Sequence, residues 1–101
     1  MVGSVYPPEI TKEYVAKAQR REAQGLTVYG DFNPLKDKRV MSVEAQDECV
    51  DIFNYMEFLI RKFPQHKSKA RKVQVKACVV YQLLKQLEEV ELSTHKKGGT
   101  V

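Results

Sequence analysis

The sequence predicts an all-α protein, a small antiparallel helical bundle with three main helices. Two observations lead to this prediction: apolar residues recur at spacings of three and four in three stretches, and no stretch shows the alternation typical of a β-strand. The chain has 101 residues, which is the size of one domain. We expect a single helical domain over residues 1–92 and a flexible polar tail over residues 93–101.

The first helix is expected to run from about Pro8 to Gln24. Proline is favoured in the first turn of a helix, and Gly25 is a natural stop. The apolar stripe of this helix is thin and leaves four cations for solvent or for a ligand: Lys12, Lys17, Arg20 and Arg21.

Residues 25–41 are rich in turn formers and are expected to form an ordered loop, with room for one short extra helical turn. Asn33 precedes Pro34, which disfavours helix at that point. Three apolar side chains are expected to anchor this loop to the core, in preference to forming a base-stacking surface: Tyr29, Phe32 and Leu35.

The second helix is predicted from Ser42, as its N-cap, through Phe63, with Pro64 ending it. At about 100° per residue, one side of this helix is apolar and is expected to face the core: Cys49, Ile52, Phe53, Met56, Ile60 and Phe63. The opposite side carries four carboxylates over two turns, which form an acidic stripe: Glu44, Asp47, Glu48 and Asp51.

The third helix is predicted from about Ser68 to Glu91. Its inner face consists of Ala70, Val73, Ala77, Val80, Leu83, Leu84, Leu87 and Val90. Three helices of this size make a thin core, and further apolar residues lie outside the main stripes: Val50, Leu59, Val79 and Tyr81. We therefore expect a homodimer or a larger homo-oligomer.

The composition excludes several classes of protein. The longest apolar runs are only a few residues, whereas a membrane span needs about 20. The N-terminus lacks the basic start and the apolar stretch of a signal peptide. We expect a soluble, cytoplasmic protein with no membrane partner, in which Cys49 and Cys78 are reduced and buried.

Charge is distributed unevenly along the chain. Residues 1–57 carry seven Lys and Arg against ten Asp and Glu, a net charge of −3, whereas residues 58–101 carry ten against three, a net charge of +7. No acid occurs between Phe58 and Leu87. A basic block of this kind attracts nucleic acid, phosphate or the acidic half of the same protein.

The acidic stripe is a candidate metal site. Its members are spaced by three, four and seven residues, which brings their oxygens within reach of a common point beside the helix. Like charges at these spacings destabilise an isolated helix, and Mg²⁺ or Mn²⁺ would relieve the repulsion, because hard cations prefer carboxylate oxygens. The alternative is a solvated face or a network of salt bridges within the chain.

The start of the third helix is a candidate anion site. Lys67, Lys69, Arg71 and Lys72 gather where the helix dipole disfavours cations, and Lys69, Lys72 and Lys76 share one face. An anion bound at the helix N-terminus would account for this placement, and solvated lysines are the alternative.

Residues 44–56 resemble the metal-binding helix of the MazG-like all-α nucleoside triphosphate pyrophosphohydrolases. Glu48 and Asp51 match the Glu-x-x-Asp pattern of that family, and the loop from Tyr29 to Leu35 is similar to small members of it. The resemblance covers about residues 25–63.

The resemblance implies a helical, usually oligomeric enzyme that uses Mg²⁺ to hydrolyse a nucleoside triphosphate to the monophosphate and pyrophosphate. By this resemblance, Glu48 and Asp51 are metal ligands, and Glu44 is a third ligand or the carboxylate that orients the attacking water. The metal polarises the phosphoryl oxygens and lowers the pKa of the water. Four cations are candidates for neutralising the triphosphate, although the family motif does not specify them: Arg61, Lys69, Lys72 and Lys76.

The sequence departs from this family in one respect. Its members carry a second pair, Glu-x-x-Glu, on a preceding helix, where this chain has Glu9 and Glu13 at a spacing of four. A pair with the right spacing occurs within residues 88–91, but it follows the motif. Either Glu44 and Asp47 replace the missing pair, or Glu13 does, or the site has lost its activity.

Two other functions fit the charge pattern. One is a basic helical nucleic-acid-binding module in which residues 61–76 contact phosphates, with too few aromatic residues there for single-strand stacking. The other is an oligomeric interaction protein whose opposite charges pair head to tail.

Nucleophilic catalysis is not expected, because His66 and His95 have no obvious Ser or Cys partner and the chain has no CxxC pair or glycine-rich phosphate loop.

Overall fold

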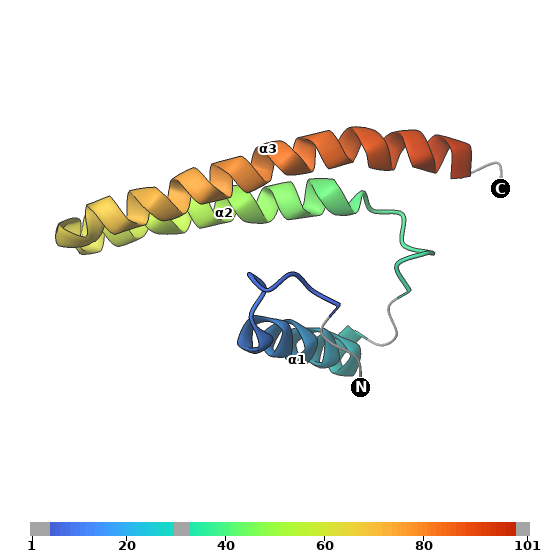
Figure 1. Ribbon diagram of the computed structural model, residues 1–101, viewed down its shortest axis with the longest axis horizontal. Coiled ribbons are helices and arrows are strands. Elements are labelled where there is room, and N and C mark those ends of the chain that lie inside the picture. The colour runs from blue at the N-terminus through green and yellow to red at the C-terminus, as the bar shows by residue number, and fades with distance from the viewer. Residues whose placement is uncertain (1–4, 30–32, 99–101) are drawn as a thin grey trace. The chain divides into compact units, whose positions relative to one another are not determined.

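The structure is a computed structural model that describes residues 5–29 and 33–98, with side chains described over 5–25 and 33–94. Three α-helices make up most of this part of the chain: α1 (Lys12–Tyr29), α2 (Met41–Lys62) and α3 (Lys67–Gly98) (Figure 1). A short 3₁₀ turn, Pro64–His66, joins α2 to α3, and no strand occurs among the described residues. The all-α class is confirmed.

Contacts between residues divide the chain into two compact units. The first unit, Met1–Asp37, contains α1, and the second, Lys38–Val101, contains α2 and α3. The antiparallel arrangement is therefore a property of the second unit. A three-helix bundle and one domain over residues 1–92 both stay predictions.

The first helix begins and ends later than the sequence predicts. It starts at Lys12 and not at Pro8, because Thr11 caps it: the Tyr14 N–H donates to Thr11 Oγ1 at 3.2 Å. It also continues past Gly25 to Tyr29. A glycine in an exposed helix costs only about 1 kcal/mol relative to alanine, which is too little to end a helix by itself.

One of the three predicted anchors of the loop before α2 is exposed. Asn33 organises a turn, because its Oδ1 accepts from the Leu35 N–H at 3.0 Å and its carbonyl accepts from the Lys36 N–H at 3.0 Å. Leu35 itself is 94% exposed, so it is no anchor. The side chains of Tyr29 and Phe32 lie outside the described residues.

The second helix ends near the predicted place but is capped differently. It ends at Lys62, one residue before Phe63, and Pro64 opens the 3₁₀ turn. Its N-cap is Val40, which makes no side-chain capping bond, and Ser42 is a buried residue within the first turn. The prediction of Ser42 as N-cap is wrong because a carboxylate from α3 takes over the capping.

The third helix is longer than predicted. Its backbone is helical from Lys67 to Gly98, so it extends through positions 93–98 of the expected tail. The helix continues because no proline or glycine lies between Glu91 and Gly98. It ends at Gly98, and glycine is a common helix terminator. The side chains beyond Thr94, including His95, lie outside the described residues.

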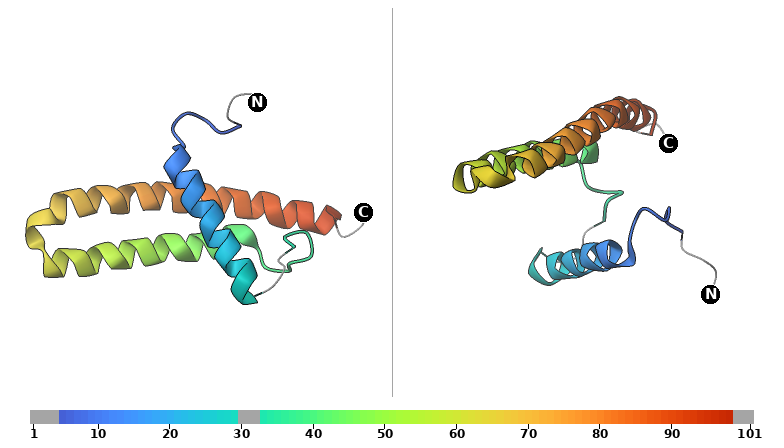
Figure 2. Two further views of the ribbon diagram at one scale, coloured as in Figure 1. Left: turned by 90° about the horizontal axis from the view of Figure 1, so that it is seen from below. Right: turned by 60° about the vertical axis from the view of Figure 1, so that its left-hand side comes forward.

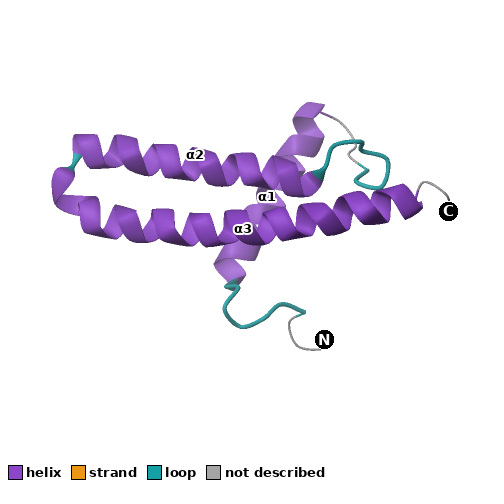
Figure 3. Cartoon of the chain, turned by 90° about the horizontal axis from the view of Figure 1, so that it is seen from above, coloured by secondary structure: helices purple, strands orange, loops and turns teal. Residues whose placement is uncertain are grey.

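Within the second unit, α2 and α3 form an antiparallel hairpin and lie side by side (Figures 2 and 3). The residues buried between them are small or polar: Ser42, Gln46, Cys49, Ala70, Gln74 and Ala77. They recur at alternating spacings of four and three, as in a coiled-coil seam. Small side chains at such a seam allow the two helices to approach closely.

The predicted core is only partly confirmed. Cys49, Ala70 and Ala77 are buried, and Met56, Ile60 and Leu84 are half-buried. The larger predicted core residues are 39–59% exposed: Ile52, Phe53, Phe63, Val73, Val80, Leu83, Leu87 and Val90. Two helices bury only the narrow strips that face each other, so the rest of each wide apolar stripe stays uncovered in the hairpin.

Candidate functional site

The acidic stripe lies on the outer side of α2. Ser42, Gln46 and Cys49 of the same helix are buried against α3, and the four acids fall on the opposite side of the helical turn. All four are exposed: Glu44, Asp47, Glu48 and Asp51. Helix α2 therefore presents them together, as predicted, but away from the rest of the hairpin.

The acids differ in their local partners. Glu44 forms an ion pair with Arg39, with 3.5 Å between its Oε1 and Nη1 of the arginine. The carboxylates of Glu48 and Asp51 have no hydrogen bond or ion pair with any residue that the structure describes. The same holds for the Asp47 carboxylate, so Glu44 is the one member of the stripe that a ligand reaches only by displacing a cation.

The stripe fits a metal ion in its chemistry but does not enclose one. Carboxylate oxygens suit Mg²⁺ and Mn²⁺. However, over residues 5–29 and 33–98 no group of three or more His, Cys, Asp or Glu residues could hold a metal. Mg²⁺ commonly takes one or two protein carboxylates together with water and substrate phosphates. Glu48 and Asp51 fit that partial role.

The predicted phosphate-binding cations are divided between the two helices, with Arg61 on α2 and the three lysines on α3. The Arg61 guanidinium lies 5.6 Å from the centre of the Phe58 ring, on the same helix. Lys69 lines a groove of about 250 Å³ near the turn of the hairpin, together with His66. Lys72 and Lys76 are exposed farther along α3.

The acids and these cations also lie in different halves of the hairpin. Interhelical hydrogen bonds pair the first turns of α2 with residues 88–91 of α3. The basic start of α3 is paired instead with the second half of α2, where Arg71 binds Glu57. A single hairpin therefore does not place the cations beside the acidic stripe.

A polar clamp at the open end of the hairpin was not predicted. Glu91 of α3 accepts hydrogen bonds from the Met41 N–H at 2.8 Å, the Ser42 N–H at 2.9 Å and the Ser42 hydroxyl at 2.6 Å. One turn along, the Gln46 amide donates to Glu88 Oε1 at 2.8 Å. The Glu91 carboxylate caps α2 and is favoured there by the helix dipole.

A second clamp lies nearer the turn. Gln74 donates to Glu57 Oε2 at 2.8 Å and to the Phe53 carbonyl at 3.1 Å, and Arg71 donates to both Gln74 and Glu57. The hydrogen bond from Gln74, followed by that from Arg71, lowers the pKa of Glu57 below its ordinary value. The sequence signal for both clamps is the four-three spacing of small and polar residues along the seam, which a search for stripes of large apolar residues does not detect.

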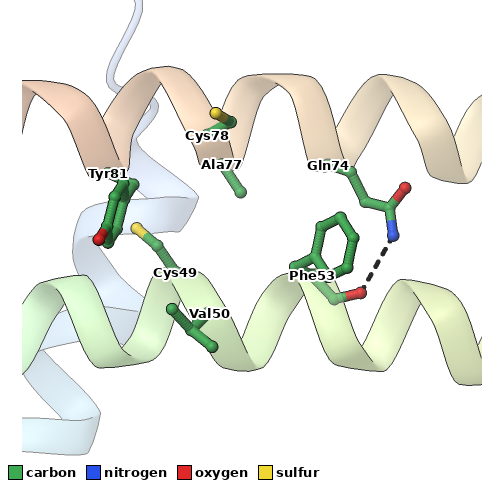
Figure 4. A pocket seen from close by; sticks show the side chains of 7 residues that line it. All are labelled: Cys49, Val50, Phe53, Gln74, Ala77, Cys78 and Tyr81. Carbon is green, nitrogen blue, oxygen red and sulfur yellow. Dashed lines mark hydrogen bonds between the residues drawn. The ribbon is translucent and has the colours of Figure 1, made fainter.

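A small groove of about 220 Å³ lies over the middle of the seam (Figure 4). Val50, Phe53 and Cys49 line it from α2, and Cys78 and Tyr81 are among its residues from α3. Cys49 is buried as predicted, whereas Cys78 is exposed and its sulfur lies 3.7 Å from the Gln82 amide nitrogen. No Asp, Glu, His, Lys or Arg side chain lines this groove, and its titratable groups are the thiols of Cys49 and Cys78 and the phenol of Tyr81.

Comparison with known proteins found no matching family model, no significantly similar curated protein and no significantly similar solved structure. Over the part of the chain that the structure describes, none of the helices has the length and apolar character needed to span a bilayer.

Proposed function

We propose that this chain is a Mg²⁺-dependent nucleoside triphosphate pyrophosphohydrolase-like protein, which converts an NTP or dNTP to the monophosphate and pyrophosphate. The observation that supports the proposal is the position of Glu48 and Asp51. Both are exposed on the outer side of α2, and neither is engaged by another described residue. Their spacing of three also matches the Glu-x-x-Asp pattern of the MazG-like helix.

In this proposal the three carboxylates have different roles. Glu48 and Asp51 would hold Mg²⁺ or Mn²⁺, a partial ligand set of the kind that Mg²⁺ commonly takes from a protein. Glu44 would orient the attacking water, or would serve as a third ligand once its ion pair with Arg39 opens and its side chain moves toward Glu48 and Asp51, because the described carboxylates do not form a group of three as they stand. When bound, the metal supplies charge that polarises the phosphoryl oxygens.

The phosphate-binding role of the cations requires more than one hairpin. Lys69, Lys72, Lys76 and Arg61 lie in the half of the hairpin that does not carry the acidic stripe. Neutralisation of a triphosphate held at Glu48 therefore depends on groups from outside the same hairpin. The proposed protein is accordingly a homodimer or a higher homo-oligomer.

The second candidate is a basic nucleic-acid-binding or oligomeric interaction protein without catalysis. The exposure of Lys69, Lys72 and Lys76 on α3 favours nucleic acid, because Lys side chains on one face can contact successive phosphates. The wide exposed apolar surface of the hairpin favours an interaction protein. Steep salt dependence without a Mg²⁺ requirement would identify nucleic-acid binding.

Thermal unfolding tests the proposed function directly. The wild-type chain is measured with and without Mg²⁺ or Mn²⁺ plus a non-hydrolysable nucleoside triphosphate, beside Glu48→Gln and the control Glu89→Gln, an exposed acid on α3. At a hundredfold excess over the dissociation constant, a specific ligand adds about 2.7 kcal/mol of stability. We expect a metal-dependent rise in Tm for wild type and Glu89→Gln only. No rise in any of the three would overturn the proposal.

A further inference from the structure

The fold separates charge along the α2–α3 hairpin. Residues 57–76, which surround the turn between the two helices, carry seven Lys and Arg against one Glu, a net charge of +6 (Figure 3). We call these residues the basic end. Residues 41–56 and 77–94 carry one Lys against seven Asp and Glu, a net charge of −6. The antiparallel pairing produces this separation, because Glu88 and Glu91 return beside the acidic first half of α2.

Most cations of the basic end are not neutralised within the hairpin. Arg71 is paired with Glu57, whereas all five lysines are exposed and form no ion pair with a described residue: Lys62, Lys67, Lys69, Lys72 and Lys76. With 22 residues, α2 is about 33 Å long, several times the screening length of about 8 Å at physiological ionic strength. The acidic residues at the other end therefore do not cancel the attraction of the basic end for an anionic surface.

Aromatic side chains are exposed among these cations. Phe63 is 45% exposed and Phe58 is 51% exposed. The Lys62 ammonium lies 5.8 Å from the centre of the Phe63 ring, and the Arg61 guanidinium lies 5.6 Å from that of Phe58. Adjacent rings and cations suit the surface of a membrane, where aromatic rings lie at the level of the headgroups and basic side chains reach the phosphates.

The groove of about 250 Å³ adds an apolar site at this end of the hairpin. Five of its seven lining residues are apolar, and the other two are His66 and Lys69. Its volume is below the roughly 300–1,000 Å³ of ordinary small-molecule pockets, so it suits part of an acyl chain better than a whole nucleotide. Phe63 lines the groove, so the exposed ring and the groove form one apolar patch among the cations.

This combination favours a lipid surface over nucleic acid. A nucleic-acid duplex supplies phosphates for the lysines, but it leaves Phe63 and the groove in water. An anionic bilayer supplies phosphates for the lysines and acyl chains for the apolar patch. Docking of this kind requires no membrane span, and the lack of a span was the basis for expecting no membrane partner.

We propose that the basic end docks on the surface of a membrane that contains anionic phospholipids, with its lysines at the headgroup phosphates and Phe63 at the boundary of the acyl chains. Val80 and Leu87, which the homo-oligomer of the proposed function would cover, lie outside the basic end. Docking does not depend on metal or nucleotide binding. A chain that docks without hydrolysing a nucleotide would leave this inference standing.

Two exposed lysines of α3 provide a matched test, because Lys69 belongs to the basic end and Lys85 does not. The full chain, Lys69→Glu and Lys85→Glu are sedimented with phosphatidylcholine vesicles that contain either no phosphatidylglycerol or an equal share of it. We expect wild type and Lys85→Glu to bind only the anionic vesicles, and Lys69→Glu to bind them about tenfold more weakly or less. Lys69→Gln and Lys85→Gln repeat the comparison if charge reversal disturbs folding. Equal weakening by the two substitutions, or equal binding to both kinds of vesicle, would overturn the proposal.

Two phenylalanines of similar exposure separate lipid from nucleic acid. Phe63 is 45% exposed in the basic end, and Phe53 is 47% exposed outside it. We expect Phe63→Ala to lower the affinity for anionic vesicles about fivefold or more, because its ring leaves water on docking, and Phe53→Ala to leave it unchanged. Circular dichroism checks that both variants fold. Unchanged affinity in Phe63→Ala would contradict the proposal, as would binding of the wild type to a DNA duplex but not to the vesicles at the same salt concentration.

Discussion

At the scale of single residues, polar side chains carry much of the interhelical specificity of the hairpin. Glu91 and Glu88 of α3 bind the first turns of α2, and Arg71 and Gln74 bind Glu57 in its second half. Because each contact joins residues far apart in the sequence, together they set the register of one helix against the other. Buried hydrogen-bonded groups of this kind are costly to leave with one partner missing.

Replacing Glu91 by alanine removes the cap of α2. The Met41 and Ser42 N–H groups and the Ser42 hydroxyl then lose their common acceptor. We expect a loss of about 1–2 kcal/mol in the free energy of unfolding, the usual cost of deleting a helix cap. Urea denaturation measures it, with Glu89→Ala as the exposed control on the same helix. An equal loss in both variants would contradict the capping role.

The lowered pKa of Glu57 predicts a dependence of stability on pH. A carboxyl with a folded pKa below its unfolded value stabilises the protein above the unfolded pKa. That contribution is lost as the pH falls through the folded pKa. We therefore expect acid destabilisation to be weaker in Glu57→Gln than in wild type, as measured by denaturation from pH 6 to pH 2 or so. An unchanged acid profile would contradict this role for the carboxylate.

At the scale of elements, the residue pattern predicted where the helices lie but did not predict all of their ends. Pro64 marks the end of α2 within two residues, because proline cannot continue the backbone hydrogen bonding of the helix. Gly25 does not end α1, and no breaker ends α3 before Gly98. Helix ends depend on caps and contacts as much as on residue preference.

Gly25→Ala is expected to stabilise α1. A Cβ at this position meets nothing within 4 Å, so the new methyl group causes no clash. Alanine also has less backbone freedom to lose on folding, which is worth about 0.5–1 kcal/mol. Hydrogen exchange of the α1 amides measures the change, with Gly25→Pro as the opposite control, because proline breaks a helix interior. Slower exchange in Gly25→Pro would refute helix at this position.

At the scale of the whole molecule, the hairpin exposes many large apolar side chains and buries few apolar residues. Among the described residues, only Cys49, Ala70 and Ala77 are buried apolar residues, whereas many larger ones stay exposed. A hairpin with so small a core gains little stability from its own burial. The homo-oligomer of the proposed function would supply the missing burial by covering exposed apolar side chains such as Val80 and Leu87.

Thermal stability is therefore expected to depend on protein concentration. Dimerisation stabilises the folded chain by mass action, so Tm of the wild type rises as the concentration increases. Val80 lies on the predicted inner face of α3 and Val79 lies one residue away, outside that face. Val80→Glu should therefore show a lower Tm that does not change with concentration, because burial of a carboxylate opposes association, and Val79→Glu should behave as wild type. Differential scanning calorimetry over a hundredfold range of concentration provides the measurement. A constant Tm for wild type would argue against association.

The sequence by itself determined the helical class, the approximate position of each helix and the exposed acidic stripe. These features depend on residue spacing along one helix, which is visible without knowing what the helix packs against. For the same reason, Glu44, Glu48 and Asp51 could be placed on one side of α2 before the hairpin was known.

Only the tertiary structure decided which residues meet across the hairpin. Prediction from apolar stripes placed Val73, Val80 and Leu87 in the core beside Ala70 and Ala77, whereas the seam is formed by the row of Ala70, Gln74 and Ala77. The two rows are neighbours on the helix surface, and hydrophobicity alone favours the row of larger apolar residues. Close approach of the helices and the hydrogen bonds of buried polar groups selected the other, because both depend on the partner helix.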